Sequence, residues 1–231
     1  MDEGRYKLLM RVAILLTIAW VAWSLYDSGL HETTPEAQDV AAARKLLEDG
    51  QFNEALLSYE RLIVDYPENT GALRGRAQAL MQLGQQEMLE AEQHRQQDEY
   101  RQADSLALVS EQRFQQALEA YDEAIRREEE SGTSEVSQSI LGVSYANRGI
   151  LKDRMGDYRG ALSDYRKSMA LYPEVTEGPG FLTRFMRNQA EKPPTIADRS
   201  RYLEQQLAKP ESERLLRLPE QDAAQRSYKL D

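Results

Sequence analysis

The chain has 231 residues, which gives room for one ordinary domain and an appendage. It carries 39 acidic and 29 basic residues, and the formal net charge of −10 argues against a general nucleic-acid binder, because phosphate neutralisation needs a basic surface. Cysteine is absent, so the sequence excludes disulfides, thiolate zinc sites and thiol catalysis, and it leaves the redox compartment open.

The most apolar segment lies near the start of the chain. Residues 8–26 carry a single charge, that of Arg11, and the run is close in length to the ~20 residues that a membrane-spanning helix needs. Arg5 and Lys7 precede it, whereas the next Lys or Arg after it is Arg44. The positive-inside rule therefore predicts a single-pass anchor at 8–26, with residues 1–7 in the cytoplasm and the large domain on the exported side, periplasmic in a bacterium.

Two other interpretations of this segment are open. A cleavable signal peptide also begins with a basic stretch and an apolar core, but the small-x-small triplet Ala22-Trp23-Ser24 lies inside the apolar run, which favours an uncleaved anchor. A buried core helix fits less well, since the run is apolar on every face. Residues 27–35 then form a short polar linker, and Pro35 suits the first turn of a following helix.

One spaced pattern occurs twice after the linker. A Gly is followed by an aromatic residue two positions later, by Ala five, by Tyr nine and by Pro seventeen positions later. The residues are Gly50, Phe52, Ala55, Tyr59 and Pro67 in the first copy, and Gly156, Tyr158, Ala161, Tyr165 and Pro173 in the second. With Ala43 before the first copy, and Tyr145 and Gly149 before the second, the pattern resembles the tetratricopeptide repeat, although Leu62 replaces the usual Ala. The resemblance implies an all-α solenoid of paired antiparallel helices.

In this register the solenoid covers residues 36–175 in about three units. The first unit is 36–69, with helices near 36–49 and 53–66, and the last is 142–175. The second unit, 70–130, is interrupted. Its first helix is indicated by Leu73, Ala77, Leu80 and Gly84, and its second by Phe114, Ala117, Tyr121, Ala124 and Ile125.

Residues 85–113, inside the second unit, contain no Gly or Pro and keep apolar residues at helical spacing. We therefore expect a helical insertion, a long hairpin that turns near residues 94–98. Residues 129–138 are expected to form a solvated loop. The helix-ending proline of the family is missing from this unit, so the helix before the loop could run on to about Glu130.

The repeat pattern stops after Pro173, and residues 176–231 are predicted to form capping helices and an extended tail. One short helix is expected around Phe181, Leu182, Phe185 and Met186. Thr195 and Asp198 have the spacing of a capping box at the start of a second helix. We expect these helices to cover the open end of the solenoid. The alternative is a tail that docks on a partner, with exposed Phe181, Phe185 and Met186 as a second interface.

No residue set suggests catalysis. The two histidines, His31 and His94, have no further ligand at metal-binding spacing, and the sequence has neither a glycine-rich phosphate loop nor a nucleophile elbow. We expect no enzyme activity, no catalytic residue, no metal and no cofactor. The first two repeat segments also resemble the non-catalytic repeat region of aspartyl/asparaginyl β-hydroxylases, but the iron ligands of that family's oxygenase domain have no counterpart here.

In the tetratricopeptide family, the first helices of successive units line a concave groove that accepts a peptide or a helix. The resemblance implies that partner-binding residues lie on these helices. They are Val40, Arg44 and Leu47 in unit one, Arg74, Gln78 and Met81 in unit two, and Ala146, Asn147, Ile150, Asp153 and Arg154 in unit three. The arginines and amides suit an acidic segment or a carboxylate terminus. The alternative is that these are ordinary solvated positions. Asn147 alone matches the chaperone-tail receptors, which disfavours that specificity.

Together these features predict a membrane-anchored scaffold or adaptor in an envelope or membrane complex. It would bind a protein or peptide partner through the groove and membrane lipid through the anchor, and it would not bind nucleic acid. The alternative is a permanent structural subunit of a large membrane complex that uses the insertion and the C-terminal tail. A regulator of an enzyme is a third possibility.

Overall fold

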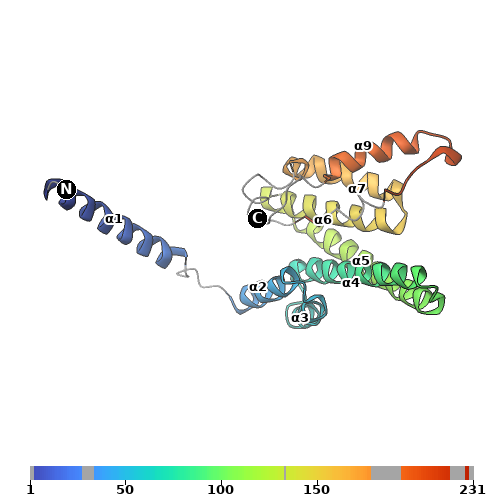
Figure 1. The fold of residues 1–231 in the computed structure, drawn as a ribbon, viewed down its shortest axis with the longest axis horizontal. Helices are drawn as coiled ribbons and strands as arrows, with labels where there is room; N and C mark the ends of the chain where they lie inside the picture. The colour runs from blue at the N-terminus through green and yellow to red at the C-terminus, as the bar shows by residue number, and fades with distance from the viewer. Residues whose placement is uncertain (1–2, 28–33, 133, 178–193, 219–226, 229–231) are drawn as a thin grey trace.

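The computed structural model describes residues 3–27, 34–132, 134–177, 194–218 and 227–228 (Figure 1). Helices and no strand occur in this part of the chain, which confirms the all-α prediction. In chain order they are α1 (Glu3–Asp27), α2 (Pro35–Glu48), α3 (Phe52–Asp65), α4 (Thr70–Gln96), α5 (Tyr100–Ser131), α6 (Glu135–Met155), α7 (Tyr158–Leu171), the short 3-10 helix η1 (Pro173–Thr176), α9 (Ile196–Leu207) and the 3-10 helix η2 (Glu211–Glu213).

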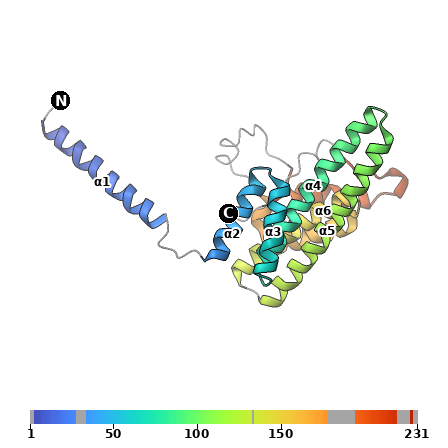
Figure 2. The same ribbon diagram turned by 90° about the horizontal axis from the view of Figure 1, so that it is seen from below.

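Helix α1 stands apart from the other helices in both ribbon views (Figures 1 and 2). None of its apolar window, Lys7–Ser24, is buried, and Trp20 and Trp23 are 69% and 67% exposed. A core helix would bury these side chains, so the core-helix interpretation is disfavoured. The helix is long and apolar enough to cross a membrane, and a signal sequence shares both properties.

Helices α2 to α7 form the repeat array, and local signals set where they begin. Thr34 caps α2 by accepting a hydrogen bond from Ala37 N at 3.2 Å, and Asn69 caps α4 by accepting one from Ala72 N at 2.9 Å. Gly50 and Gly156 end α2 and α6 with φ of 79° and 86°, a conformation that favours glycine. The repeated glycine therefore lies at the tight turn between the two helices of a unit.

The helical insertion expected in the second unit is present. Helices α4 and α5 are continuous through it and form one long antiparallel hairpin, whose tip projects from the array (Figure 2). The turn occupies residues 97–99, where Asp98 adopts a φ of 63° and Tyr100 Oη donates to Asp98 Oδ1 at 2.9 Å. His94 Nδ1 lies 2.5 Å from Glu99 Oε2 across the same turn.

The expected solvated loop at 129–138 is wrong in extent. Helix α5 continues to Ser131, and α6 begins at Glu135 after its N-cap Ser134. Two contacts with the start of α4 and the residues before it hold the end of α5. The Thr70 hydroxyl donates a hydrogen bond to the Glu128 carboxylate, and Arg127 donates one to the carbonyl of Pro67. These contacts hold the backbone helical beyond the place where the family proline would end it.

Close packing between the helices depends on glycines that face aromatic rings. A Cβ added at Gly75 of α4 would lie 2.2 Å from the ring of Tyr59 on α3, and one at Gly149 of α6 would lie 2.7 Å from the ring of Tyr165 on α7. Both tyrosines are buried. The missing side chain lets each ring lie against the backbone of the neighbouring helix.

The C-terminal part of the chain packs against the last repeat. Helix α9 contacts α7 and η1 and fully buries Ile196 and Leu203. The predicted capping box is confirmed, because Thr195 Oγ1 accepts from Asp198 N and Asp198 Oδ2 accepts from Thr195 N. The helix expected around Phe181, Phe185 and Met186 lies outside the described residues.

Candidate functional site

The first helices of the three units, α2, α4 and α6, carry the eleven residues that the repeat register assigns to the groove. The structure divides them into two groups. Arg44 is exposed, and Val40, Arg74, Gln78 and Arg154 are half-buried. The remaining six are buried: Leu47, Met81, Ala146, Asn147, Ile150 and Asp153. Leu47, Met81, Ala146 and Ile150 belong to the main hydrophobic core, so they stabilise the array and are not accessible to a partner.

Arg74 is engaged by a neighbouring helix. Its Nη1 lies 2.6 Å from Glu128 Oε1 of α5, and the two side chains are 21% and 9% exposed. Burial lowers the pKa of Arg74, and the carboxylate of Glu128 opposes that change. The positive charge of Arg74 is therefore balanced by Glu128 within the protein. Arg44, which is exposed, is the more available cation among the residues of α2 and α4 assigned to the groove.

Asp153 is also occupied by the chain itself. Arg199 of α9 donates two hydrogen bonds to its carboxylate, each 2.7 Å long, and Tyr165 Oη donates a third at 3.2 Å. Asp153 and Arg199 are each 4% exposed. Arg199 also donates to the carbonyl of Leu216 at 2.8 Å. The sequence-based assignment of Asp153 to a partner site is therefore replaced by a structural role in holding α9.

Asn147 has a partner at the far end of the chain. Its Nδ2 donates to the Tyr228 carbonyl at 3.1 Å, and its Oδ1 accepts from the Tyr228 N–H at 2.7 Å. From α4, Gln82 Nε2 donates to Ser227 Oγ at 3.3 Å. The third-unit end of the predicted groove thus holds a segment of the same chain.

Sequence reasoning missed Glu128, Arg199 and Tyr228, which contact the predicted groove residues Arg74, Asp153 and Asn147. Glu128 and Arg199 lie in charge-rich helices that offer no signal to separate them from their solvated neighbours. Tyr228 does carry a signal, because it is the only aromatic residue after Tyr202 and stands in a polar tail. Its position in the groove could not be inferred from that.

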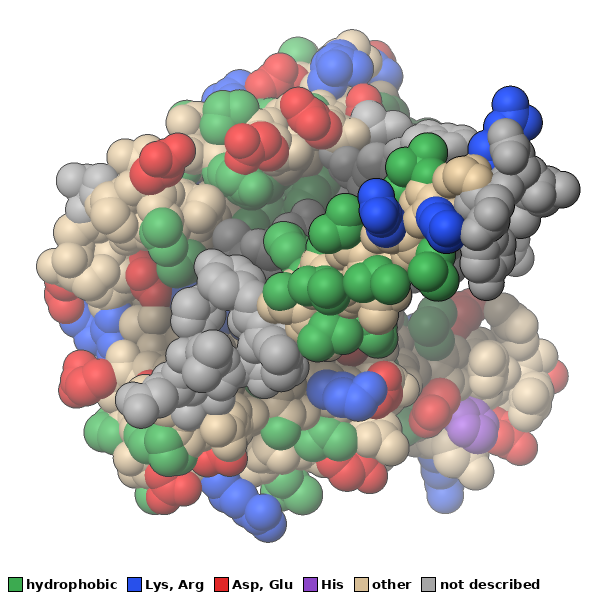
Figure 3. Space-filling model, turned by 90° about the vertical axis from the view of Figure 1, so that its left-hand side faces the viewer, with side chains coloured by type: hydrophobic (Ala, Val, Ile, Leu, Met, Phe, Trp, Pro, Cys, Tyr) green, Lys and Arg blue, Asp and Glu red, His purple; other side chains and the backbone are tan. Residues whose placement is uncertain are grey.

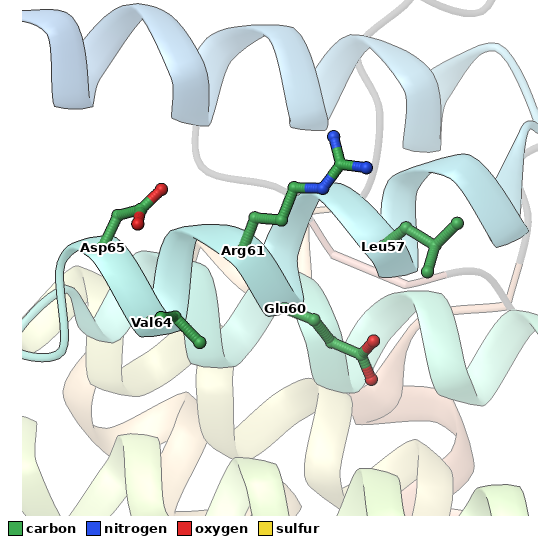
Figure 4. A pocket seen from close by; sticks show the side chains of 5 residues that line it. All are labelled: Leu57, Glu60, Arg61, Val64 and Asp65. Atoms are coloured by element: carbon green, nitrogen blue, oxygen red, sulfur yellow. The ribbon is translucent and has the colours of Figure 1, made fainter.

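The two best-defined depressions among the described residues are open to solvent. A shallow depression on α3 is lined by Leu57, Glu60, Arg61, Val64 and Asp65, all from this one helix (Figure 4). Acidic and basic side chains are interspersed on the face shown in Figure 3. Among the described residues there is no group of three or more His, Asp or Glu side chains that could hold a metal ion.

A family model described as tetratricopeptide repeat matches residues 40–87, which include most of α2, all of α3 and the first two-thirds of α4. Residues 40–87 therefore carry a tetratricopeptide repeat. No curated protein and no solved structure matches the chain. The matched segment ends inside α4, before the turn of the long hairpin.

Proposed function

We propose that this tetratricopeptide-repeat protein is a membrane-anchored scaffold or adaptor that binds a protein partner. Repeats of this family suggest protein–protein interaction, and the family is generally non-catalytic. The observation that carries the proposal is the accessible part of the first two units, where exposed Arg44 lies on α2 near half-buried Val40, and Gln78 lies on the adjacent helix α4. We call this set, with Arg74, the proximal face.

The chemistry of the proximal face favours an acidic partner segment. Arg44 offers a planar donor fork to a carboxylate, Gln78 offers an amide, and Val40 offers an apolar contact. The carboxylate of Glu128 already satisfies Arg74. A partner side chain or C-terminal carboxylate would therefore be held mainly by Arg44.

The anchor would place this face next to a membrane. The apolar window Lys7–Ser24 is unburied and follows Arg5, and no basic residue occurs between Arg11 and Arg44. By the positive-inside rule, the N terminus lies in the cytoplasm and the repeat array on the exported side. The proposed setting is a membrane or envelope complex.

A photo-crosslinking residue placed at Gln78 of the full-length chain in its native membrane tests the proposal. We expect a crosslinked partner from this position, and we expect Arg44→Glu in the same chain to reduce its yield at least ~10-fold by charge reversal, which corresponds to about 1.4 kcal/mol. Leu57, 56% exposed on α3, is the matched control position and should give no such product. A product that survives Arg44→Glu would contradict the assignment to this face.

A second candidate function is that of a permanent subunit that docks through the hairpin. Four apolar side chains along α4 and α5 are exposed: Met88, Leu89, Tyr100 and Leu108, with Leu89, Tyr100 and Leu108 each more than half exposed. A crosslinker at Leu108 separates the two candidates. A partner captured there and not at Gln78 would favour the permanent-subunit function.

A further inference from the structure

The segment Ser227–Tyr228 is bound to the array in the manner of a peptide ligand. Asn147 contacts both the N–H and the carbonyl of Tyr228, so its side-chain amide satisfies the complete backbone of one residue. Asn147 is only 4% exposed, and it lies on a first helix of a repeat unit. Such a pair of hydrogen bonds recognises an extended backbone and does not depend on the side chain that the backbone carries.

Side-chain contacts add specificity for the two residues. The Tyr228 hydroxyl accepts a hydrogen bond from Ile196 N at 3.0 Å, one of the amides that a helix N terminus leaves without a helical partner. The Tyr228 ring packs against the hydrophobic core, and burial raises the pKa of its hydroxyl. Gln82 binds the hydroxyl of Ser227. Three separate helices, α4, α6 and α9, therefore contribute to one dipeptide site.

The elements around the dipeptide are fixed by other contacts. Helix α9 is anchored by the buried ion pair between Arg199 and Asp153, by buried Ile196 and Leu203, and by its own capping box at Thr195. Ser227 and Tyr228, by contrast, are half-buried and are joined to the array by the few hydrogen bonds described above and by the packing of the Tyr228 ring. Removal of the dipeptide would leave α9 and the repeats with their main contacts.

We propose that the pocket formed by Gln82, Asn147 and the N terminus of α9 is a peptide-binding site, and that Ser227–Tyr228 is its resident, displaceable ligand. The incoming ligand is an extended segment with a small hydroxyl residue followed by tyrosine. Access of a partner to this end of the groove then requires displacement of the chain's own segment. The displacement by a partner rests on the proposed function, whereas the binding of Ser227–Tyr228 to the pocket, here called self-occupancy, does not.

A labelled peptide with the sequence of residues 222–231 tests the site without any partner. Its affinity is measured by fluorescence anisotropy for the full-length chain in detergent and for a chain that ends at Arg226. A tethered ligand acts at an effective concentration on the order of mM. We therefore expect the shortened chain to bind the peptide at least ~10-fold more tightly than the full-length chain, if the free peptide binds with a Kd of ~100 μM or below.

Two substitutions assign the binding to the site. Asn147→Ala in the shortened chain and Tyr228→Ala in the peptide should each abolish measurable binding, whereas Asn53→Ala on the outer helix α3 should have no effect. Equal affinity of the full-length and shortened chains would overturn self-occupancy. A shortened chain that stays folded without binding the peptide would overturn the site, and one that unfolds would show that the segment is a permanent part of the fold.

The two proposals can fail separately. The peptide assay contains no partner, so it can succeed when crosslinking from Gln78 captures nothing. Crosslinking at the proximal face can likewise succeed when the peptide does not bind, because Val40, Arg44 and Gln78 make no contact that the dipeptide site requires.

Discussion

Two ion pairs join α9 to the repeat array, and they differ in burial. Asp153 and Arg199 are each 4% exposed and share two hydrogen bonds, whereas Arg166 and Glu204 are 61% and 44% exposed. Solvent screens the second pair, and the entropy of two long side chains opposes it. In the first pair, each charge depends largely on its partner, because both side chains are almost fully removed from water.

Asp153→Asn should therefore destabilise the chain strongly, since it leaves the buried guanidinium of Arg199 without a counter-charge. We expect a loss of about 3–5 kcal/mol in the free energy of unfolding. Arg166→Ala, the matched change in the exposed pair, should cost less than ~1 kcal/mol. Urea unfolding followed by circular dichroism measures both. Similar losses for the two variants would show that α9 does not depend on the buried pair.

Packing between successive helices depends on pairs of a glycine and an aromatic ring. Ala is favoured over Gly in a helix interior by up to ~1 kcal/mol, so propensity alone predicts that Gly75→Ala stabilises α4. The added Cβ would lie 2.2 Å from the Tyr59 ring, and Tyr59 is 3% exposed. Overpacking of this kind costs typically ~1–3 kcal/mol and should exceed the gain in propensity.

A double-mutant cycle tests this prediction. We expect Gly75→Ala to lower the free energy of unfolding in the wild-type background and to cost less in a Tyr59→Leu background, where the ring no longer fills the space. Equal costs in both backgrounds, measured by thermal or urea unfolding, would argue that the glycine is needed for another reason.

Local and distant interactions explain which elements the sequence could predict. The bounds of α2 and α3 fall within one or two residues of expectation, because Thr34, Pro35 and Gly50 act on their own neighbours. The loop after α5 was expected to begin at residue 129, although the missing proline allowed the helix to continue to about Glu130. Its end at Ser131 is supported by Glu128 and Arg127, which contact residues about 60 positions earlier in the chain. Pattern analysis of a single helix does not detect such contacts.

The candidate site was predictable only in part, for the same reason. Repeat register predicts that α2, α4 and α6 line a groove, but it does not predict which other residues of the chain cover these helices. Asn147 is covered by Tyr228, which lies 81 residues away, and Asp153 by Arg199, 46 residues away. Both partners come from the segment after the last repeat, where the periodic pattern has ended.

At the scale of the whole molecule, the repeat array is expected to fold without its N-terminal helix. No part of the window Lys7–Ser24 is buried, and the hydrophobic core of the described residues consists of residues from Val40 onward. Deletion of residues 1–27 should therefore give a soluble, helical monomer, because the deletion removes exposed apolar surface and no core contact. Size-exclusion chromatography with light scattering measures the outcome. Aggregation of the shortened chain would reveal another large apolar surface and favour the permanent-subunit function.

With α1 anchored in a membrane, the short distance along the chain between α1 and α2 would limit where the repeat array can act. Residues 28–33 separate Asp27 from Thr34, and even a fully extended backbone would span no more than ~25 Å over that interval. With α1 in a bilayer, Thr34 at the start of the first repeat unit would remain within that distance of the end of α1. The proximal face would then be confined to a thin layer beside the membrane. A partner could bind it only by exposing its acidic segment close to the bilayer.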